Sequence, residues 1–167
     1  YTFMANFAFI DSQNVYRAIC EQRWKIDYAK FRNYLHSKFQ VKNAYYFIGY
    51  VSTNQSLYTV LQEAGFILVF KPTLDINGKI KGNVDTELVL KAMIEYENYQ
   101  KAVIVSGDGD FYCLIEYLEK NDKLEKIIVP DINGYSSLLR KYSGYIMGMN
   151  DLREKLEYKK RQASPRD

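Results

Sequence analysis

Short, continuous apolar runs that alternate with helical patterns are the feature of this chain that most restricts its fold. The runs cover residues 7–10, 43–50, 66–70, 102–105, 126–129 and, more briefly, 145–147. They lack the alternation of a strand with one face in water, so they predict strands buried on both faces of a parallel sheet. Helices supply the crossovers that parallel strands require. We therefore expect an α/β protein, a three-layer fold with a mostly parallel central sheet of five to six strands.

The predicted helices lie between these runs, and their apolar residues recur at helical spacing. Asp27 is expected to cap the helix at 28–39, while Val60 and Met93 are expected on the inner faces of the helices that contain them. The predicted helices are 15–20, 28–39, 54–64, one that starts at Asp85, 111–119, 136–142 and 151–160. This regular alternation, without an internal repeat or a linker, predicts a single domain.

The connections predict where a ligand binds. Right-handed crossovers give the strand order 3-2-1-4-5, with the runs numbered along the chain. The order reverses between the first and fourth strands, which lead into Asp11 and Asp108. Because ligands of such folds bind at the carboxyl ends of the strands at this reversal, we expect the functional site there.

The stretch 103–111, Val-Ile-Val-Ser-Gly-Asp-Gly-Asp-Phe, ends an apolar run in two glycines and two aspartates. The glycines are expected to allow a tight loop, on which Asp108 and Asp110 lie close together. Two carboxylates held so closely repel each other, so one gains a proton unless a cation neutralises them. The stretch therefore indicates a functional site.

Three more residues are expected in the same crevice. Asp11 and Asn14 follow the first strand, and Asp85 lies in the first turn of the helix before the fourth strand. An acid there also opposes the helix dipole favourably, but Asp85 stands one turn before Leu88 and shares its buried face. An all-oxygen set of ligands suits Mg²⁺ or Mn²⁺. Water bound to such an ion is a nucleophile for phosphodiesters.

Other chemistries fit the sequence less well. It has no G-x-x-x-x-G-K-[ST] loop, no G-x-G-x-x-G after the first strand and no G-x-S-x-G, so nucleotide cofactors and a serine hydrolase are not expected. The lone His36 and the separated Cys20 and Cys113 give neither a zinc site nor a disulfide framework. Two unpaired cysteines favour a reducing, cytoplasmic setting.

Four basic residues are candidates for contacts with a nucleic acid. The Asn77-Gly78 pair predicts a tight hairpin that brings Lys71, Lys79 and Lys81 together. These lysines, with Arg17, are candidate contacts to a nucleic-acid backbone, and the alternative is an ordinary solvated hairpin. Glu87 is expected to be solvated.

Residues 4–167 divide into a domain at 4–150, with Met4 as the expected natural start, and an appended C-terminal helix and basic tail at 151–167. The net charge of +3 does not by itself indicate a nucleic-acid partner. No apolar run approaches the roughly 20 residues of a membrane span, and no signal peptide is evident. We expect a cytoplasmic protein without a membrane partner.

Three blocks of sequence give the chain a family resemblance. They are Phe-Ile-Asp-Ser-Gln-Asn at 9–14, Lys-Gly-Asn-Val-Asp at 81–85 and Val-Ser-Gly-Asp-Gly-Asp-Phe at 105–111. In this order and spacing the chain resembles the NYN domain family, within the PIN-like nuclease superfamily, over about residues 7–147. It departs from the family pattern at Ser12, where glycine is common, and at Ser143-Gly144, where an Ala-Asp pair is common.

The resemblance implies a PIN-like fold and a Mg²⁺- or Mn²⁺-dependent ribonuclease. It implies that Asp11, Asp85 and Asp108 form the acidic metal site. Asn14 matches a position that orients Asp11 or a water, and Asp110 matches a further ligand, direct or through water. Ser106 matches a serine that steadies the loop or contacts phosphate.

The leading hypothesis is a metal-dependent endoribonuclease that acts on single-stranded or structured RNA, with a homodimer as a candidate assembly. The alternatives are a catalytically inactive RNA-binding or regulatory module on the same fold, a metal-dependent phosphatase, and acids that merely cap helices.

Overall fold

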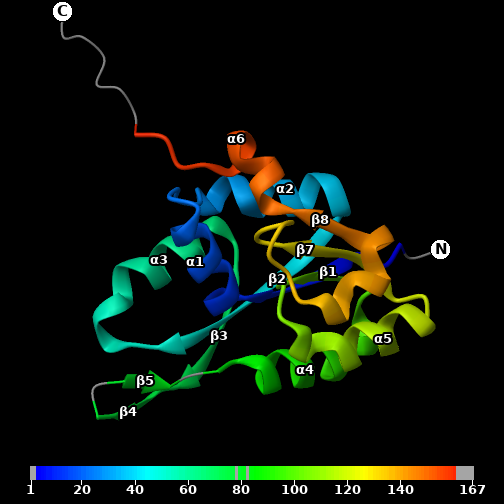
Figure 1. The fold of residues 1–167 in the computed structure, drawn as a ribbon, viewed down its shortest axis with the longest axis horizontal. Coiled ribbons are helices and arrows are strands. Elements are labelled where there is room, and N and C mark those ends of the chain that lie inside the picture. Colours follow the sequence, from blue (N-terminus) through cyan, green and yellow to red (C-terminus); the bar gives the residue numbers. More distant parts are fainter. Residues whose placement is uncertain (1–2, 78, 82, 161–167) are drawn as a thin grey trace, which may run out of the picture.

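A six-stranded, wholly parallel sheet forms the centre of the protein (Figure 1). The computed structural model describes residues 3–77, 79–81 and 83–160, and only the backbone of 74–76 and 79–81. The sheet comprises β3 (Ile67–Pro72), β2 (Val41–Tyr50), β1 (Asn6–Asp11), β6 (Ala102–Val105), β7 (Leu124–Val129) and β8 (Ile146–Gly148), in that spatial order. The predicted fold class and strand order are confirmed.

Helices cover both faces of the sheet (Figure 1). One layer contains α1 (Ser12–Glu21), α2 (Tyr28–Phe39), α3 (Gln55–Ala64) and the short α6 (Arg153–Leu156), and the other contains α4 (Asp85–Ile94) and α5 (Tyr112–Lys120). Side chains of β1 alternate between two hydrophobic cores, one on each face of the sheet. Phe7 and Phe9 pack toward α4 and α5, while Ala8 and Ile10 pack toward α1 and α2. All these side chains are buried, so the run is continuous in sequence.

The expected hairpin forms beside the sheet. Strands β4 (Leu74–Ile76) and β5 (Lys79–Lys81) pair antiparallel, and Asn77 between them has a positive φ of 54°. Asparagine tolerates this left-handed conformation better than most residues do. Gly78 of the predicted turn, Gly82 and the basic tail at 161–167 lie outside the described residues.

The C-terminal segment differs from its prediction. The helix expected at 136–142 is instead the first part of a 3₁₀ helix (Ser137–Tyr145) that Ser136 caps. The helix expected at 151–160 is a 3₁₀ turn (Met149–Leu152) followed by the four residues of α6. Further 3₁₀ segments are Ser52–Asn54, Tyr96–Asn98 and Gly109–Phe111. The helix ends early because Glu157 turns to extended backbone and forms a β-bridge with Ile26.

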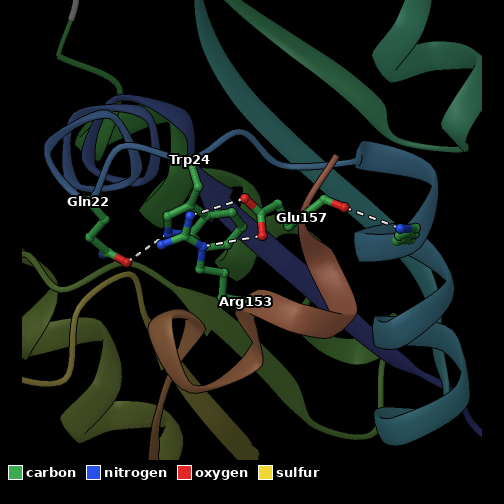
Figure 2. Close-up of polar contacts among 5 residues, drawn as sticks. Gln22, Trp24, Arg153 and Glu157 are labelled. Carbon is green, nitrogen blue, oxygen red and sulfur yellow. Dashed lines mark hydrogen bonds and ion pairs between the residues drawn. The ribbon is translucent and has the colours of Figure 1, made fainter. Parts of the chain in front are cut away.

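Figure 2 shows how α6 is fastened to the loop between α1 and α2. Arg153 forms an ion pair with Glu157 and lies over the Trp24 ring, and Trp24 Nε1 donates to Gln22 Oε1 at 2.9 Å. Lys30 Nζ donates to the Glu157 carbonyl at 3.1 Å. These contacts hold residues 153–157 against the first layer. The division of the chain at residue 150 stays a prediction.

Three expectations about the burial of apolar residues are wrong. Val60 is 49% exposed, because the inner face of α3 is formed by Tyr58 and Leu61. Met93 is 37% exposed, because Leu88 and Ala92 form the face of α4 that packs against the sheet. The third strand is not fully buried, since β3 is the sheet edge. Within the described residues, no helix has the length and apolar character that crossing a bilayer requires.

Candidate metal centre

The ends of two neighbouring strands and the start of one helix bring three aspartates together. Strands β1 and β6 are direct neighbours, with Ile10 opposite Val105. Asp11 ends β1, Asp108 is the third residue after β6, and Asp85 begins α4. Each of the three offers a carboxylate oxygen, and these oxygens lie within 4.8 Å of one another. The site therefore lies at the predicted reversal of strand order.

Ser106 connects two of these aspartates. Its side chain is buried, and its hydroxyl donates to Asp11 Oδ2 at 3.0 Å while it accepts from the Asp108 backbone N–H at 3.1 Å. One hydroxyl thus fixes both a carboxylate and the loop that carries the second carboxylate.

Asn14 connects the end of β1 to the loop that follows β6. Its side-chain Oδ1 accepts from the Gly107 N–H at 2.8 Å, and its backbone N–H donates to Asp11 Oδ1 at 3.3 Å. The second contact makes Asp11 the N-cap of α1, which starts at Ser12 rather than at the expected Val15. A contact between Asn14 and water stays a prediction.

The loop that contains Gly107 and Gly109 needs glycine because neighbouring residues lie close to it, not because its backbone angles are unusual. Among the described residues, Gly65 is the one glycine with a positive φ. A Cβ on Gly109 would lie 2.4 Å from Ser136 Oγ and 3.0 Å from Leu138 Cδ1. Glycine there permits the close approach of the segment at 136–138.

The electrostatics of the cluster favour a cation. Burial raises the pKa of Asp85 to about 6, and the charges of Asp108, Asp11 and Asp110 add to the rise. A side-chain hydrogen bond from Asn83 opposes it. Burial also raises the pKa of Asp11, against the lowering effect of its bonds to Asn14 and Ser106. Ionised carboxylates are therefore costly here unless a positive charge lies among them.

The donor set fits a small divalent cation. Three carboxylates offer only oxygen ligands, which Mg²⁺ and Mn²⁺ prefer. Ligands on opposite sides of Mg²⁺ lie about 4.2 Å apart, since each bond is about 2.1 Å long. The observed 4.8 Å limit is within a small side-chain rotation of that spacing. Asp11, Asp85 and Asp108 can thus hold a divalent metal.

Asp110 lies outside this group of three. It is exposed, and its N–H donates to Asp108 Oδ1 at 2.9 Å. Its side chain borders a shallow groove beside Asp85, Thr86 and Met93. Its role as a further ligand stays a prediction.

The predicted basic contacts are placed unequally. Lys71 Nζ donates to the Asn83 carbonyl and pairs with Glu87 Oε2 at 3.4 Å. Glu87 is therefore half-buried and paired, and its expected solvation is wrong. Arg17 is exposed on α1. The side chains of Lys79 and Lys81 lie outside the described part of the chain.

Asn83 is a site residue that sequence reasoning missed. Its Oδ1 accepts from the Asp85 N–H at 2.9 Å and so fixes the first turn of α4. Asparagine just before an apolar helical pattern is a helix-start signal, and this signal could have identified it.

The raised pKa of Asp85 predicts a pH-dependent response to metal. Without metal, the folded state holds the proton more tightly than the unfolded state, so the free energy of unfolding falls as pH rises from about 4 to about 6. Because Asp85 is half-exposed, we expect a loss of about 1 kcal/mol, or about 2–4 °C in Tm. Mg²⁺ should restore stability at about pH 7.5 and much less at about pH 5, where protons compete with it. Thermal unfolding with EDTA or Mg²⁺ tests this, and the same pH slope in Asp85→Asn would contradict it.

Comparison with known proteins agrees with this architecture. A family model for the NYN domain matches residues 7–146. The Synechococcus elongatus "Low amplitude and bright protein LabA" is 27% identical over 161 residues, which cover 89% of this chain and 86% of LabA. A solved structure of a protein of unknown function from Vibrio parahaemolyticus has a TM-score of 0.76 at 22% identity, with 95% of this chain and 99% of that one covered, and so shares the fold. The chain belongs to the NYN domain family, and its fold is the PIN-like nuclease fold.

Proposed function

We propose that this protein is an endoribonuclease that hydrolyses RNA phosphodiester bonds with Mg²⁺ or Mn²⁺ held by Asp11, Asp85 and Asp108. The observation that carries the proposal is the convergence of these three carboxylates within 4.8 Å at the carboxyl edge of the sheet. Membership of the NYN family supports a nuclease. RNA as the substrate and a cytoplasmic location are parts of the same proposal, and a homodimer stays a prediction.

The chain's own residues supply position and charge. A divalent cation, when bound, lowers the pKa of water and stabilises the charge that develops on phosphate. The carboxylates would hold that cation. Hydrogen bonds of Ser106 and Asn14 fix the positions of Asp11 and of the loop at 107–108 relative to each other. In this scheme no side chain is needed as a general base.

Basic residues would hold the substrate by its phosphates. Arg17 is free to turn toward an RNA strand because its side chain is exposed. Lys71 contributes less positive charge than expected, since Glu87 pairs with it. With Lys79 and Lys81, these residues would fix the position of RNA rather than read its sequence.

Cleavage of defined RNAs tests the proposal. We expect single-stranded or structured RNA to be cut with Mg²⁺ or Mn²⁺ and left intact with EDTA. Asp108→Asn should lower the rate at least about 100-fold. Mutating residues that only hydrogen-bond to metal ligands already lowers metal affinity or activity about 10–100-fold, and Asp108 is itself a proposed ligand. Asp110→Asn is the matched control: it removes a charge from the same loop but from outside the group of three, and should cost less than about tenfold.

Two other results would contradict the proposal. Tight RNA binding without cleavage under every metal condition would indicate an RNA-binding module. Hydrolysis of nucleotides or phosphomonoesters alone would indicate a phosphatase.

A further inference from the structure

A pocket of about 400 Å³ opens at the carboxyl end of β2, between α1 and α3. Ser12 and Gln13 form its edge nearest the metal centre, and they directly follow Asp11 in the chain. Figure 1 shows α1 and α3 on the face of the sheet opposite α4. The pocket and Asp11 thus lie at the same edge of the sheet, where the carboxyl ends of the strands meet. The residues that line the pocket are Ser12, Gln13, Tyr16, Tyr28, Tyr46, Ile48, Gly49, Val51, Asn54, Leu57 and Thr73.

The lining combines three tyrosines and two amides with aliphatic and small polar residues. Tyr16 stands at the rim and is 68% exposed, whereas Tyr46 is buried in the wall. Gln13 and Asn54 contribute amides that both donate and accept hydrogen bonds. None of the described residues in the lining carries a formal charge. The pocket therefore suits a neutral, flat group with hydrogen-bonding edges better than a phosphate or a carboxylate.

The inner wall is held in place by packing. The rings of Tyr28 and Tyr46 meet edge to face at 6.1 Å, and Phe66 packs against both. Burial raises the pKa of both tyrosines, so their hydroxyls stay neutral. Proteins hold unstacked RNA bases by stacking them on aromatic side chains, and the exposed Tyr16 ring beside this packed wall offers such a surface.

We propose that this pocket binds a nucleobase of the RNA strand whose scissile phosphate lies at Asp11, Asp85 and Asp108. This inference rests on the proposed function. The Cα atom of Gln13 lies at most about 7.6 Å from that of Asp11, because two trans peptides separate them. The pocket volume falls in the range of about 300–1,000 Å³ that is usual for small-ligand sites. A base in the pocket would fix which phosphodiester bond meets the carboxylates.

Free nucleosides test the pocket without metal or catalysis. With EDTA present, adenosine, guanosine, cytidine and uridine are added at millimolar concentrations to ¹⁵N-labelled protein. At least one of them should shift the amide signals of Gln13 and Gly49. The shifts should vanish in Leu57→Trp, which fills the pocket, and weaken about tenfold or more in Tyr16→Ala, which removes a stacking ring. Tyr16 is exposed, so this second variant keeps the fold even if Leu57→Trp does not.

Tyr117→Ala is the matched control, because Tyr117 is an exposed helical tyrosine on α5, away from the pocket lining. Its loss should leave the shifts unchanged. No shift with any nucleoside, or equal loss in Tyr16→Ala and Tyr117→Ala, would overturn the proposal. Shifts that follow protein dilution instead of nucleoside would assign the pocket to a second copy of the chain and would also overturn it.

Abasic substitution in RNA then connects the pocket to the cleaved bond. Removing one base at a fixed distance from the cut should shift or slow cleavage about tenfold or more in the wild-type protein. The same substitution should have no effect in Tyr16→Ala. Cleavage that ignores every abasic position overturns the pocket and leaves the nuclease intact. Nucleoside binding without any RNA cleavage would refute the nuclease and the link to a scissile phosphate, but not base binding itself.

Discussion

Replacing Asp11 by asparagine should lower metal-dependent RNA cleavage at least about 100-fold and, at the same time, stabilise the metal-free protein. Activity falls because one of the three converging carboxylates is lost. Stability rises because a buried charge close to Asp108 is removed. Asparagine keeps an oxygen for the Asn14 N–H, and Ser106 can accept from the new amide. We expect a gain of about 0.5–2 kcal/mol, the usual size of a single stabilising substitution.

Urea unfolding in EDTA, together with initial cleavage rates in Mn²⁺, measures both effects. Asp27→Asn is the matched control, since Asp27 caps α2 through the Lys30 N–H just as Asp11 caps α1. That variant should keep its activity and should not become more stable. A loss of stability in Asp11→Asn similar to that of other buried polar substitutions would mean that Asp11 has a structural role only.

Ser106→Ala should destabilise the protein by about 1–3 kcal/mol and lower cleavage about 10–100-fold. The substitution leaves Asp11 Oδ2 and the Asp108 N–H without their shared partner in a buried place. Asp11 also loses a bond that lowers its pKa, so its carboxylate becomes harder to ionise and binds metal less tightly. This is the behaviour expected of a residue that positions the ligands.

Calorimetric titration with Mn²⁺ separates positioning from general destabilisation. Affinity for the ion should fall in Ser106→Ala, and the pH at which half the activity is reached should move upward. Ser37→Ala, on the exposed side of α2, provides the baseline. Unchanged Mn²⁺ affinity and an unchanged pH profile in Ser106→Ala would show that the serine only supports the fold.

The topology and the site location were predictable because they depend on local signals. Continuous apolar runs identify strands that are buried on both faces, and right-handed crossovers then restrict the strand order. That order places the ends of β1 and β6 side by side. Asp11 and Asp108 are therefore close together for reasons that can be read in the sequence. Asp85 could be predicted at the same site because it stands one helical turn before Leu88, whose side chain is buried.

The errors come from contacts between distant parts of the chain. The pairing of Glu157 with Ile26 ends α6 early, and no pattern near Glu157 indicates it. Lys71 on β3 forms an ion pair with Glu87 on α4, so Glu87, which was expected in solvent, is half-buried. In α3, the face that packs against the sheet contains Tyr58 and Leu61, so Val60, which was expected there, is exposed instead. The double role of Ser106 likewise depends on the approach of β1 to β6.

Crystals grown with Mn²⁺ test the central claim, that Asp11, Asp85 and Asp108 form one metal site, most directly. Anomalous difference density should show an Mn²⁺ peak among the three carboxylates, with oxygen ligands at about 2.1 Å. The peak should be lost in crystals of Asp108→Asn. Density that is absent from this position while Mn²⁺ binds elsewhere, or a peak that persists in Asp108→Asn with ligands from other residues, would contradict the account.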